Sequence, residues 1–233
     1  RIAAILDKAD AIRRRRQEAA RLADTLIPSV FYEMFGDPVK NPNSYVPQRI
    51  EDFCRTGTGG TPSRDRAEFY GGETPWVKSG ELKENWIAGT EEHVSDDGIA
   101  ASRLRLLPAG TILLALYGAT VGRMARLSIP ATTNQAVCHI VPDEDVAHPT
   151  WLYQALRLKV PEMLAQRVGG AQPNISQGLV KALSIGLPSP AAQKDFVRHV
   201  ERVEQLTNRQ ATARDESDSF FNALVQRAFR GEL

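Results

Sequence analysis

The chain has 233 residues, of which 42% are hydrophobic and 24% charged, and its formal net charge is +1 at pH 7. This length is enough for one or two domains with a buried core, and the balanced charge excludes a polycation. No apolar run reaches the ~20 residues that a membrane helix needs, and no signal peptide is visible. Cys54 and Cys138 lie far apart without metal-ligand spacing, which predicts reduced, buried thiols in a cytosolic protein.

Residues 2–35 are predicted to form one long helix, because apolar residues, Leu26 among them, recur at a spacing of three to four. Pro28 should kink this helix just before itself, and Gly36-Asp37-Pro38 should end it. We therefore divide the start of the chain into a helix over 1–37 and a linker over 38–46. Because the chain starts with an arginine inside the helical pattern, we expect it to be a fragment or to lack its natural start.

Between residues 47 and 190 the sequence predicts one domain of mixed α/β (α+β) class. Glycine-rich segments separate its elements, and loops on a sheet scaffold are where recognition usually lies. The expected elements are strands over 111–116, 122–127 and 136–141 and helices over 150–164 and 175–183, the second helix with Asn174 or Ser176 as its N-cap.

The last segment, 191–233, nearly repeats the first at a constant offset of 194 residues, since Ile2 coincides with Phe196 and Phe35 with Phe229. A repeated helix on both sides of a different segment is typical of a spacer. We expect two long antiparallel helices forming a coiled-coil stalk, each roughly 50 Å long at ~1.5 Å per residue. The second helix covers 191–230, with a heptad-like seam that includes Phe196, Val200, Val203 and Leu206.

The sequence shows no catalytic centre. Gly57 to Pro62 is not followed by the Lys-Ser or Lys-Thr of a nucleotide-phosphate loop, so we interpret it as a turn-rich loop. The four histidines lack paired zinc spacing, and His139, inside an apolar run, is expected to be a satisfied core histidine. Asp143-Glu144-Asp145 is interpreted as a solvated turn in preference to a cation site.

Seven short motifs follow one another along the central domain. They are Gly59-Gly60-Thr61-Pro62-Ser63, Pro75-Trp76-Val77-Lys78-Ser79-Gly80-Glu81-Leu82, Leu107-Pro108-Ala109-Gly110-Thr111, Tyr117-Gly118-Ala119-Thr120-Val121-Gly122, Thr133-Asn134-Gln135-Ala136, Gln172-Pro173-Asn174-Ile175-Ser176 and Leu187-Pro188-Ser189-Pro190-Ala191-Ala192-Gln193. In this order they resemble the target-recognition domain of type I restriction-modification specificity (S) subunits. The flanking segments 1–10, 33–38 and 227–233 resemble that family's conserved spacer helices.

This resemblance implies a function without catalysis. In that family a full subunit has two recognition domains, each reading one half of a bipartite DNA target, and two helices that set their spacing. The present chain resembles the second half. The implied partners are double-stranded DNA, methyltransferase (modification) subunits and the restriction/motor subunit. S-adenosylmethionine would be bound by the methyltransferase, and no cofactor by this chain. A homodimer through the helices and a location in the prokaryotic cytoplasm, without membrane contact, are further expectations.

Residues with paired donors and acceptors on the motifs are candidates for reading bases: Lys78, Arg123, Asn134, Gln135, Gln172 and Asn174. Hydroxyl groups near glycines that allow close backbone approach are candidates for binding phosphates: Thr58, Thr61, Ser63, Ser79, Thr120 and Ser176, with Gly59 and Gly60. Tyr117 could stack on a base or bond a phosphate. Three alternatives remain open: a solvated charge for Lys78, a strand-end cap for Asn134 and Gln135, and a core position for Tyr117.

Charge gives a second interpretation of the function. Residues 47–190 contain 14 Lys and Arg against 15 Asp and Glu, a net charge of −1, whereas most affinity for duplex DNA comes from neutralised phosphates. The domain should therefore bind weakly unless its cations gather on one face. Arg13 to Arg16 point all round the first helix and are interpreted as solvated, with contact to the DNA backbone or to an acidic partner surface as the alternative. The alternative function is a coiled-coil scaffold whose head binds protein, although the ordered motifs favour DNA specificity.

Overall fold

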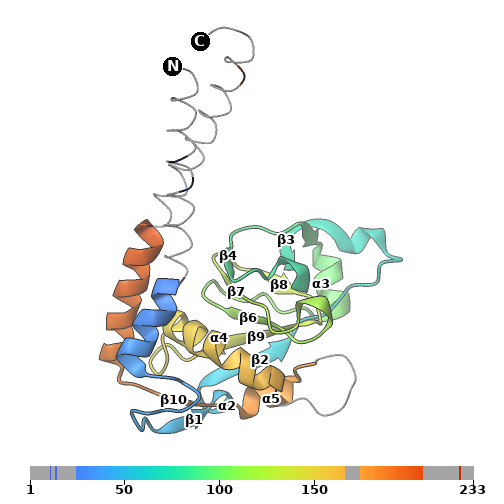
Figure 1. The fold of residues 1–233 in the computed structure, drawn as a ribbon. Helices are drawn as coiled ribbons and strands as arrows, with labels where there is room; N and C mark the ends of the chain where they lie inside the picture. Colours follow the sequence, from blue (N-terminus) through green and yellow to red (C-terminus); the bar gives the residue numbers. More distant parts are fainter. Residues whose placement is uncertain (1–10, 12–13, 15–24, 166–173, 207–225, 227–233) are drawn as a thin grey trace. The chain divides into compact units, whose positions relative to one another are not determined.

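The computed structural model describes residues 11, 14, 25–165, 174–206 and 226, and the chain divides into two units (Figure 1). One unit comprises residues 1–34 and 195–233, and the other comprises Phe35–Lys194. Within the residues so described, no helix is long and apolar enough to cross a membrane.

The first unit contains helical residues from both ends of the chain. Residues 25–34 and 195–206 of this unit are helical, and the rings of Phe31 and Phe196 meet edge to face with centroids 5.5 Å apart. Val200 and Val203 are buried, as the seam predicts. Most of the expected stalk, over 2–24 and 207–230, lies outside the described residues. Of the run Arg13 to Arg16, only Arg14 is described. The long coiled coil therefore stays a prediction.

The predicted apolar seam is wrong at two positions, because the side chains there are exposed. Leu26 is 46% exposed and Leu206 is 52% exposed. At about 100° per residue, Leu26 lies about 140° round the helix from Phe31, and Leu206 lies about 80° round from Phe196. The alternation of four and three residues through Phe196, Val200 and Val203 places the next seam position at 207, so a seam drawn through Leu206 leaves the contact face.

The first helix ends where the sequence predicts, at Phe35. Gly36 has a φ of +74°, and a Cβ there would clash with the ring of Pro42. The carboxylate of Asp37 then accepts a hydrogen bond from Val39 N at 2.8 Å, which turns the chain into the linker. Positive φ is costly for any residue with a side chain, so Gly36 fixes this end of the helix.

A five-stranded sheet forms the centre of the second unit, in the order β2 (Cys54–Thr58), β9 (Val137–Pro142), β6 (Ile112–Ala115), β7 (Met124–Leu127) and β4 (Asn85–Ile87). All neighbours are antiparallel except the parallel pair β4 and β7. The mixed α/β class is confirmed, and β6, β7 and β9 fall within the predicted strands to within a residue. Gly57 and Thr58 belong to β2, so the expected turn-rich loop starts only at Gly59.

A three-stranded sheet, β5 (Glu92–Val94), β3 (Tyr70–Val77) and β8 (Thr132–Thr133), packs on one face of the first, and β1 (Pro47–Arg49) pairs with β10 (Ser184–Gly186). The core between the two larger sheets includes Val77, Leu113 and Leu127, all with no exposed surface. Side chains alternate along a strand, so Ile112 and Leu114 of β6 are buried on the opposite face.

The helices of the second unit are short apart from α4 (Pro149–Ala165), which contacts β9. The other helical segments are α2 (Ile50–Phe53), α3 (Asp96–Ser102), α5 (Gln177–Ala182) and the 3-10 turns η1 (Ala67–Phe69), η2 (Ser79–Glu81) and η3 (Gly118–Thr120). α4 and α5 confirm the predicted helices. Ser176 is the N-cap of α5, because its hydroxyl accepts a hydrogen bond from Leu179 N at 3.1 Å.

Candidate nucleic-acid interface

Four strand ends of the five-stranded sheet meet at one place, which we call the loop end (Figure 1). The last residue of β2, Thr58, pairs with Cys138, and the last residue of β6, Ala115, pairs with Val137. β7 starts beside the end of β6, since Ala115 N donates to Arg123 O at 2.8 Å. The register therefore gathers the segments 58–63, 117–123 and 134–135 around the loop end.

Two further candidate segments are held nearby by backbone hydrogen bonds. Ile175 N donates to Leu116 O at 2.7 Å, which places residues 174–176 beside the end of β6. Asn134 N donates to Val77 O at 2.9 Å, which places Lys78 and Ser79 beside segment 134–135. Among the candidates, only Gln172 lies outside the described residues.

Gly59, the first glycine of the first motif, is required by packing. Gly60 N donates to Thr133 O at 3.0 Å, and a Cβ on Gly59 would overlap the Thr133 carbonyl. Trp76 Nε1 also donates to Gly60 O, at 3.1 Å. Gly59 therefore lets the segment lie directly on β8, which explains this glycine without a phosphate.

Thr61 and Gln135 come from different motifs and touch each other. The Thr61 hydroxyl donates to the Gln135 side-chain oxygen, and both residues are exposed. The backbone of Asn134 makes the turn into β9, because Val137 N donates to Asn134 O at 3.1 Å. Its side-chain oxygen is buried and has no hydrogen-bond partner among the described residues. The backbone of Asn134 therefore caps the strand end, and the side-chain carboxamides of Asn134 and Gln135 are not needed for this role.

The segment after β6 presents an aromatic ring and a cation. Tyr117 is 39% exposed, so the alternative core position is wrong. Gly118 has a φ of +82°, which turns the chain into η3 and away from the strand. Thr120 is half-buried in η3, and Arg123 is exposed. This segment is therefore an accessible part of the loop end.

Hydroxyl groups and a carboxamide complete the exposed candidates. Thr58, Ser63, Asn174 and Ser176 are exposed, and Ser79 is half-buried at the start of η2. The Ser176 hydroxyl accepts the cap hydrogen bond of α5. Asn174 is not the cap, so its carboxamide is left for other contacts.

Lys78 is ion-paired, so the alternative of a freely solvated charge is wrong. Its Nζ lies 2.9 Å from a carboxylate oxygen of Glu91 and 2.8 Å from one of Glu92. Its backbone N–H donates to Glu81 at 2.9 Å. Pairing with Glu92, and then with Glu91, raises the pKa of the Lys78 ammonium.

Arg64 is a further charged residue here that the sequence interpretation did not single out. Its guanidinium makes two hydrogen bonds to the Glu92 carboxylate, at 2.6 and 3.3 Å, and stacks over Tyr70 with 4.4 Å to the ring centroid. The signal in the sequence was its position, directly after the first motif at Ser63. Its partner Glu92 lies 28 residues away, which no local pattern indicates.

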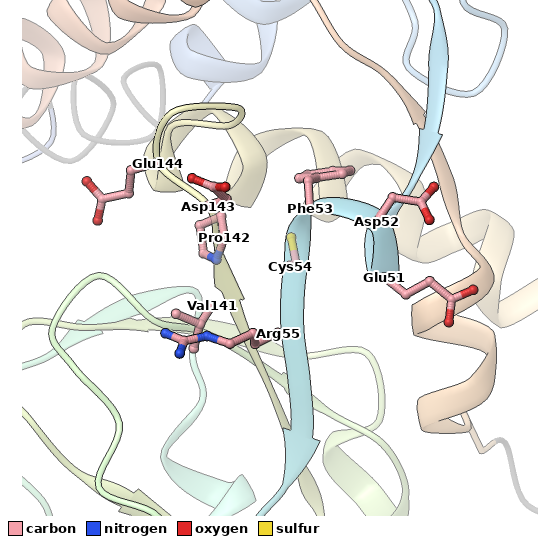
Figure 2. A pocket seen from close by; sticks show the side chains of 9 residues that line it. All are labelled: Glu51, Asp52, Phe53, Cys54, Arg55, Val141, Pro142, Asp143 and Glu144. Carbon is pink, nitrogen blue, oxygen red and sulfur yellow. The ribbon is translucent and has the colours of Figure 1, made fainter.

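The opposite end of the sheet carries a cavity of about 490 Å³ lined with acidic residues (Figure 2). Four carboxylates come from α2 and its neighbouring turn, namely Glu51, Asp52, Asp143 and Glu144. Negative charge repels DNA phosphates, so this cavity is not a DNA contact. Across the described part of the chain, no three potential metal-ligating side chains form a group.

Three titratable groups are buried within the sheet. Burial raises the pKa of the Cys54 and Cys138 thiols to about 12, and both are free, as predicted. Burial, together with Arg105, lowers the pKa of His139 to about 4. His139 is a core residue, but the expected satisfied state is wrong: its Nδ1 finds no partner among the residues described, and its ring lies against Gly57.

Comparison with known protein families gives a match over most of this domain. Residues 42–215 match the family model described as type I restriction modification DNA specificity domain. The chain is 31% identical over 172 residues to the type I restriction enzyme MjaIX specificity subunit of Methanocaldococcus jannaschii, covering 72% of the chain and 39% of that protein. It is 27% identical over 199 residues to the HindI specificity subunit of Haemophilus influenzae, covering 82% of the chain and 42% of that protein. The chain thus spans about two fifths of the length of these relatives.

Solved structures share the fold. The HsdS subunit from Thermoanaerobacter tengcongensis superposes with a TM-score of 0.64 at 20% identity, covering 100% of this chain and 57% of that one. A chain from a structural study of complex assembly and conformational transition of the type I R-M system gives a TM-score of 0.71, again at 20% identity, covering 100% of this chain and 58% of that one. At this identity the likeness is one of fold.

Proposed function

The chain belongs to the type I restriction modification DNA specificity family, and on that premise we propose that it reads one half of a bipartite DNA target. The family match over residues 42–215 carries the proposal. The alternative of a protein-binding scaffold without DNA readout is not favoured, because the relatives are DNA-specificity subunits.

The loop end is the proposed DNA-reading surface. It brings together side chains that suit base edges, in particular Arg123 and Gln135, and both are exposed. Carboxamides can pair with adenine, and arginine with guanine. Around them lie the hydroxyls proposed to bind phosphates, from Thr58, Thr61, Ser63, Ser79, Thr120 and Ser176, together with Tyr117.

The chain is proposed to act by binding, with catalysis in its partners. Methyltransferase subunits would bind S-adenosylmethionine and methylate an adenine amino group, and a restriction/motor subunit would cut unmodified DNA. The two end helices are proposed to form the spacer that positions these subunits, and the complex would work in the prokaryotic cytoplasm. The packing of Phe31 against Phe196 supports a pairing of the two helices.

A second copy of the chain is proposed to supply the other half-site. One recognition domain accounts for one half of a bipartite target, and symmetric dimers are the commonest closed assembly. Sedimentation of the chain at high micromolar concentration tests this part. A dimer supports it, and a monomer throughout would refute it for the isolated chain.

A selection experiment tests the function. The chain, assembled with its methyltransferase subunits, is incubated with a pool of random duplexes, and the retained duplexes are sequenced. One enriched sequence should appear, and Gln135→Ala should relax preference at one base pair, at a cost of ~1–3 kcal/mol. Asn43→Ala, in the linker, is the matched carboxamide control and should leave the preference unchanged. Enrichment no greater than that of the methyltransferase subunits alone would refute the proposal.

A further inference from the structure

Four charged side chains form one cluster, which we call the Glu92 cluster: Arg64, Lys78, Glu91 and Glu92. Glu92 is its centre, because one carboxylate accepts hydrogen bonds from the Arg64 guanidinium at 2.6 Å and from Lys78 Nζ at 2.8 Å. Glu91 also accepts a hydrogen bond from Lys78 Nζ, at 2.9 Å. The two cations and two anions sum to zero charge.

The cluster is held rigidly from several directions. The Arg64 guanidinium stacks on Tyr70 and lies 5.2 Å from the centroid of Trp76. Tyr70 in turn donates its hydroxyl proton to Pro62 O at 2.6 Å. On the other side, the Glu81 carboxylate accepts hydrogen bonds from the backbone N–H groups of both Lys78 and Glu91, at 2.9 and 2.7 Å.

The cluster lies next to the loop end. Arg64 directly follows the segment 58–63, and Lys78 directly follows Val77, whose carbonyl accepts the hydrogen bond from Asn134 N. The side chain of Arg64 is 56% exposed, while those of Lys78 and Glu92 are 28% and 29% exposed. Two cations therefore lie within reach of a duplex bound at the loop end, and both are already paired with the Glu92 carboxylate.

This arrangement changes what the cations can do for DNA binding. A lysine or arginine at a DNA surface normally attracts phosphates of every sequence alike, and that attraction supplies most non-specific affinity. A carboxylate between the two cations must be displaced before either can bind a phosphate fully. Discrimination between partners rises when interactions with the wrong partner are made unfavourable.

We propose that Glu92 is a specificity-determining residue of the DNA interface: it holds Arg64 and Lys78 in place at the loop end while preventing them from binding phosphates independently of sequence. The inference rests on the proposed function, since it assumes that the loop end binds DNA. Glu92 acts through the two cations and is a positioning residue with an electrostatic role.

The test is the salt dependence of binding by Glu92→Gln in the chain assembled with its methyltransferase subunits. Binding is measured to the selected duplex and to a scrambled duplex across a salt series. The variant frees Arg64 and leaves Lys78 paired with Glu91 alone. Affinity for the scrambled duplex should therefore rise, and its salt slope should steepen by ~0.9 if Arg64 binds a phosphate and by ~2 if Lys78 binds one as well. The ratio of selected to scrambled affinity should fall.

A matched control and a double variant isolate the mechanism. Glu73→Gln removes the same charge from β3, where Glu73 is exposed and forms no ion pair within the described part of the chain, and it should leave the slope unchanged. Adding Arg64→Ala to Glu92→Gln should remove the part of the steeper salt slope that comes from Arg64. Arg64→Ala alone should change the salt slope by less than the ~0.9 expected for one phosphate contact, because Glu92 already neutralises the guanidinium.

The outcomes separate this inference from the function itself. Equal salt slopes for Glu92→Gln and Glu73→Gln, or a uniform loss of affinity in Glu92→Gln, would overturn the inference while leaving DNA reading intact. If the unmodified complex does not distinguish the selected from the scrambled duplex, the proposed function fails first. Thermal unfolding of each variant shows whether it is folded, and the Arg64→Ala comparison stands even if Glu92→Gln is unstable.

Discussion

The buried carboxamide of Gln193 accepts a hydrogen bond from the backbone N–H of His148 at 2.8 Å. Its own amino group donates to Val146 O at 3.1 Å and to Pro188 O at 3.0 Å. One side chain, 1% exposed, thereby ties the segment before α4 to the start of the last helix.

Gln193→Ala should destabilise the protein by about 3 kcal/mol, because it removes the three hydrogen bonds of a buried side chain, and each such bond contributes ~0.5–1.5 kcal/mol. Chemical denaturation followed by circular dichroism measures the effect. Gln48→Ala is the control, since the Gln48 side chain makes no hydrogen bond within the described ranges. A loss for Gln193→Ala no larger than for Gln48→Ala would contradict this account.

Gly59→Ala should destabilise the domain by ~1–3 kcal/mol, the usual cost of overpacking, because its Cβ would overlap the Thr133 carbonyl. Gly89→Ala is the control, since no atom lies within 4 Å of a Cβ built there. Both are compared by thermal unfolding. If Gly59 serves DNA alone, Gly59→Ala will lose affinity at unchanged stability, and the packing explanation fails.

His139 should make stability depend on pH. The unfolded imidazole binds a proton at its usual pKa of 6.5, whereas the folded one stays neutral down to about pH 4. Between these values the unfolded state binds more protons, so stability falls with falling pH by up to ~1.4 kcal/mol per pH unit. His139→Leu should remove this slope in denaturation curves between pH 6.5 and 4. An identical slope in the variant would contradict the prediction.

A second effect of pH on stability comes from the Glu92 carboxylate, at lower pH. Hydrogen bonds from Arg64, and then from Lys78, lower the pKa of Glu92 to about 2. The stability that this pair contributes is present above pH 4.5 and is lost as pH falls towards 2. The His139 effect is therefore measured above pH 4.5 and the Glu92 effect below pH 4.

Cys54 and Cys138 should resist alkylation in the folded protein, because burial keeps both thiols protonated and the thiolate is the reactive form. Iodoacetamide labelling followed by mass spectrometry should show modification only after denaturant is added. Cys138 has no exposed surface and Cys54 is 9% exposed, so Cys54 should react first. Rapid labelling of Cys138 in native buffer would be inconsistent with the structure.

The parts of the fold that could be predicted from the sequence are those with a local signal. β6 and β9 are continuous apolar runs because both faces of the central sheet are buried, and α4 shows its apolar residues at helical spacing. β2 gave no such signal: its residues Cys54 to Thr58 are mostly polar or glycine, and it becomes a strand by pairing with β9, about eighty residues later.

The candidate site also combines features that the motifs indicate with contacts that they do not. The motifs identified the segments that meet at the loop end, but their order could not show that Gly59 is needed for packing on β8. The pairing of Arg64 and Lys78 through Glu92 depends on the register of β3 with β5, where Trp76 pairs with Glu92. Such contacts between distant residues exist only once the sheets have formed.

The central claim is that this chain selects the DNA sequence that its partners methylate. The most direct test is methylome sequencing of cells that carry the gene, cells that lack it, and cells that carry the variant Gln135→Ala. Loss of the gene should abolish adenine methylation at one bipartite sequence, and the variant should extend methylation to targets that differ at one base pair. An unchanged set of methylated sequences in cells lacking the gene would contradict the account.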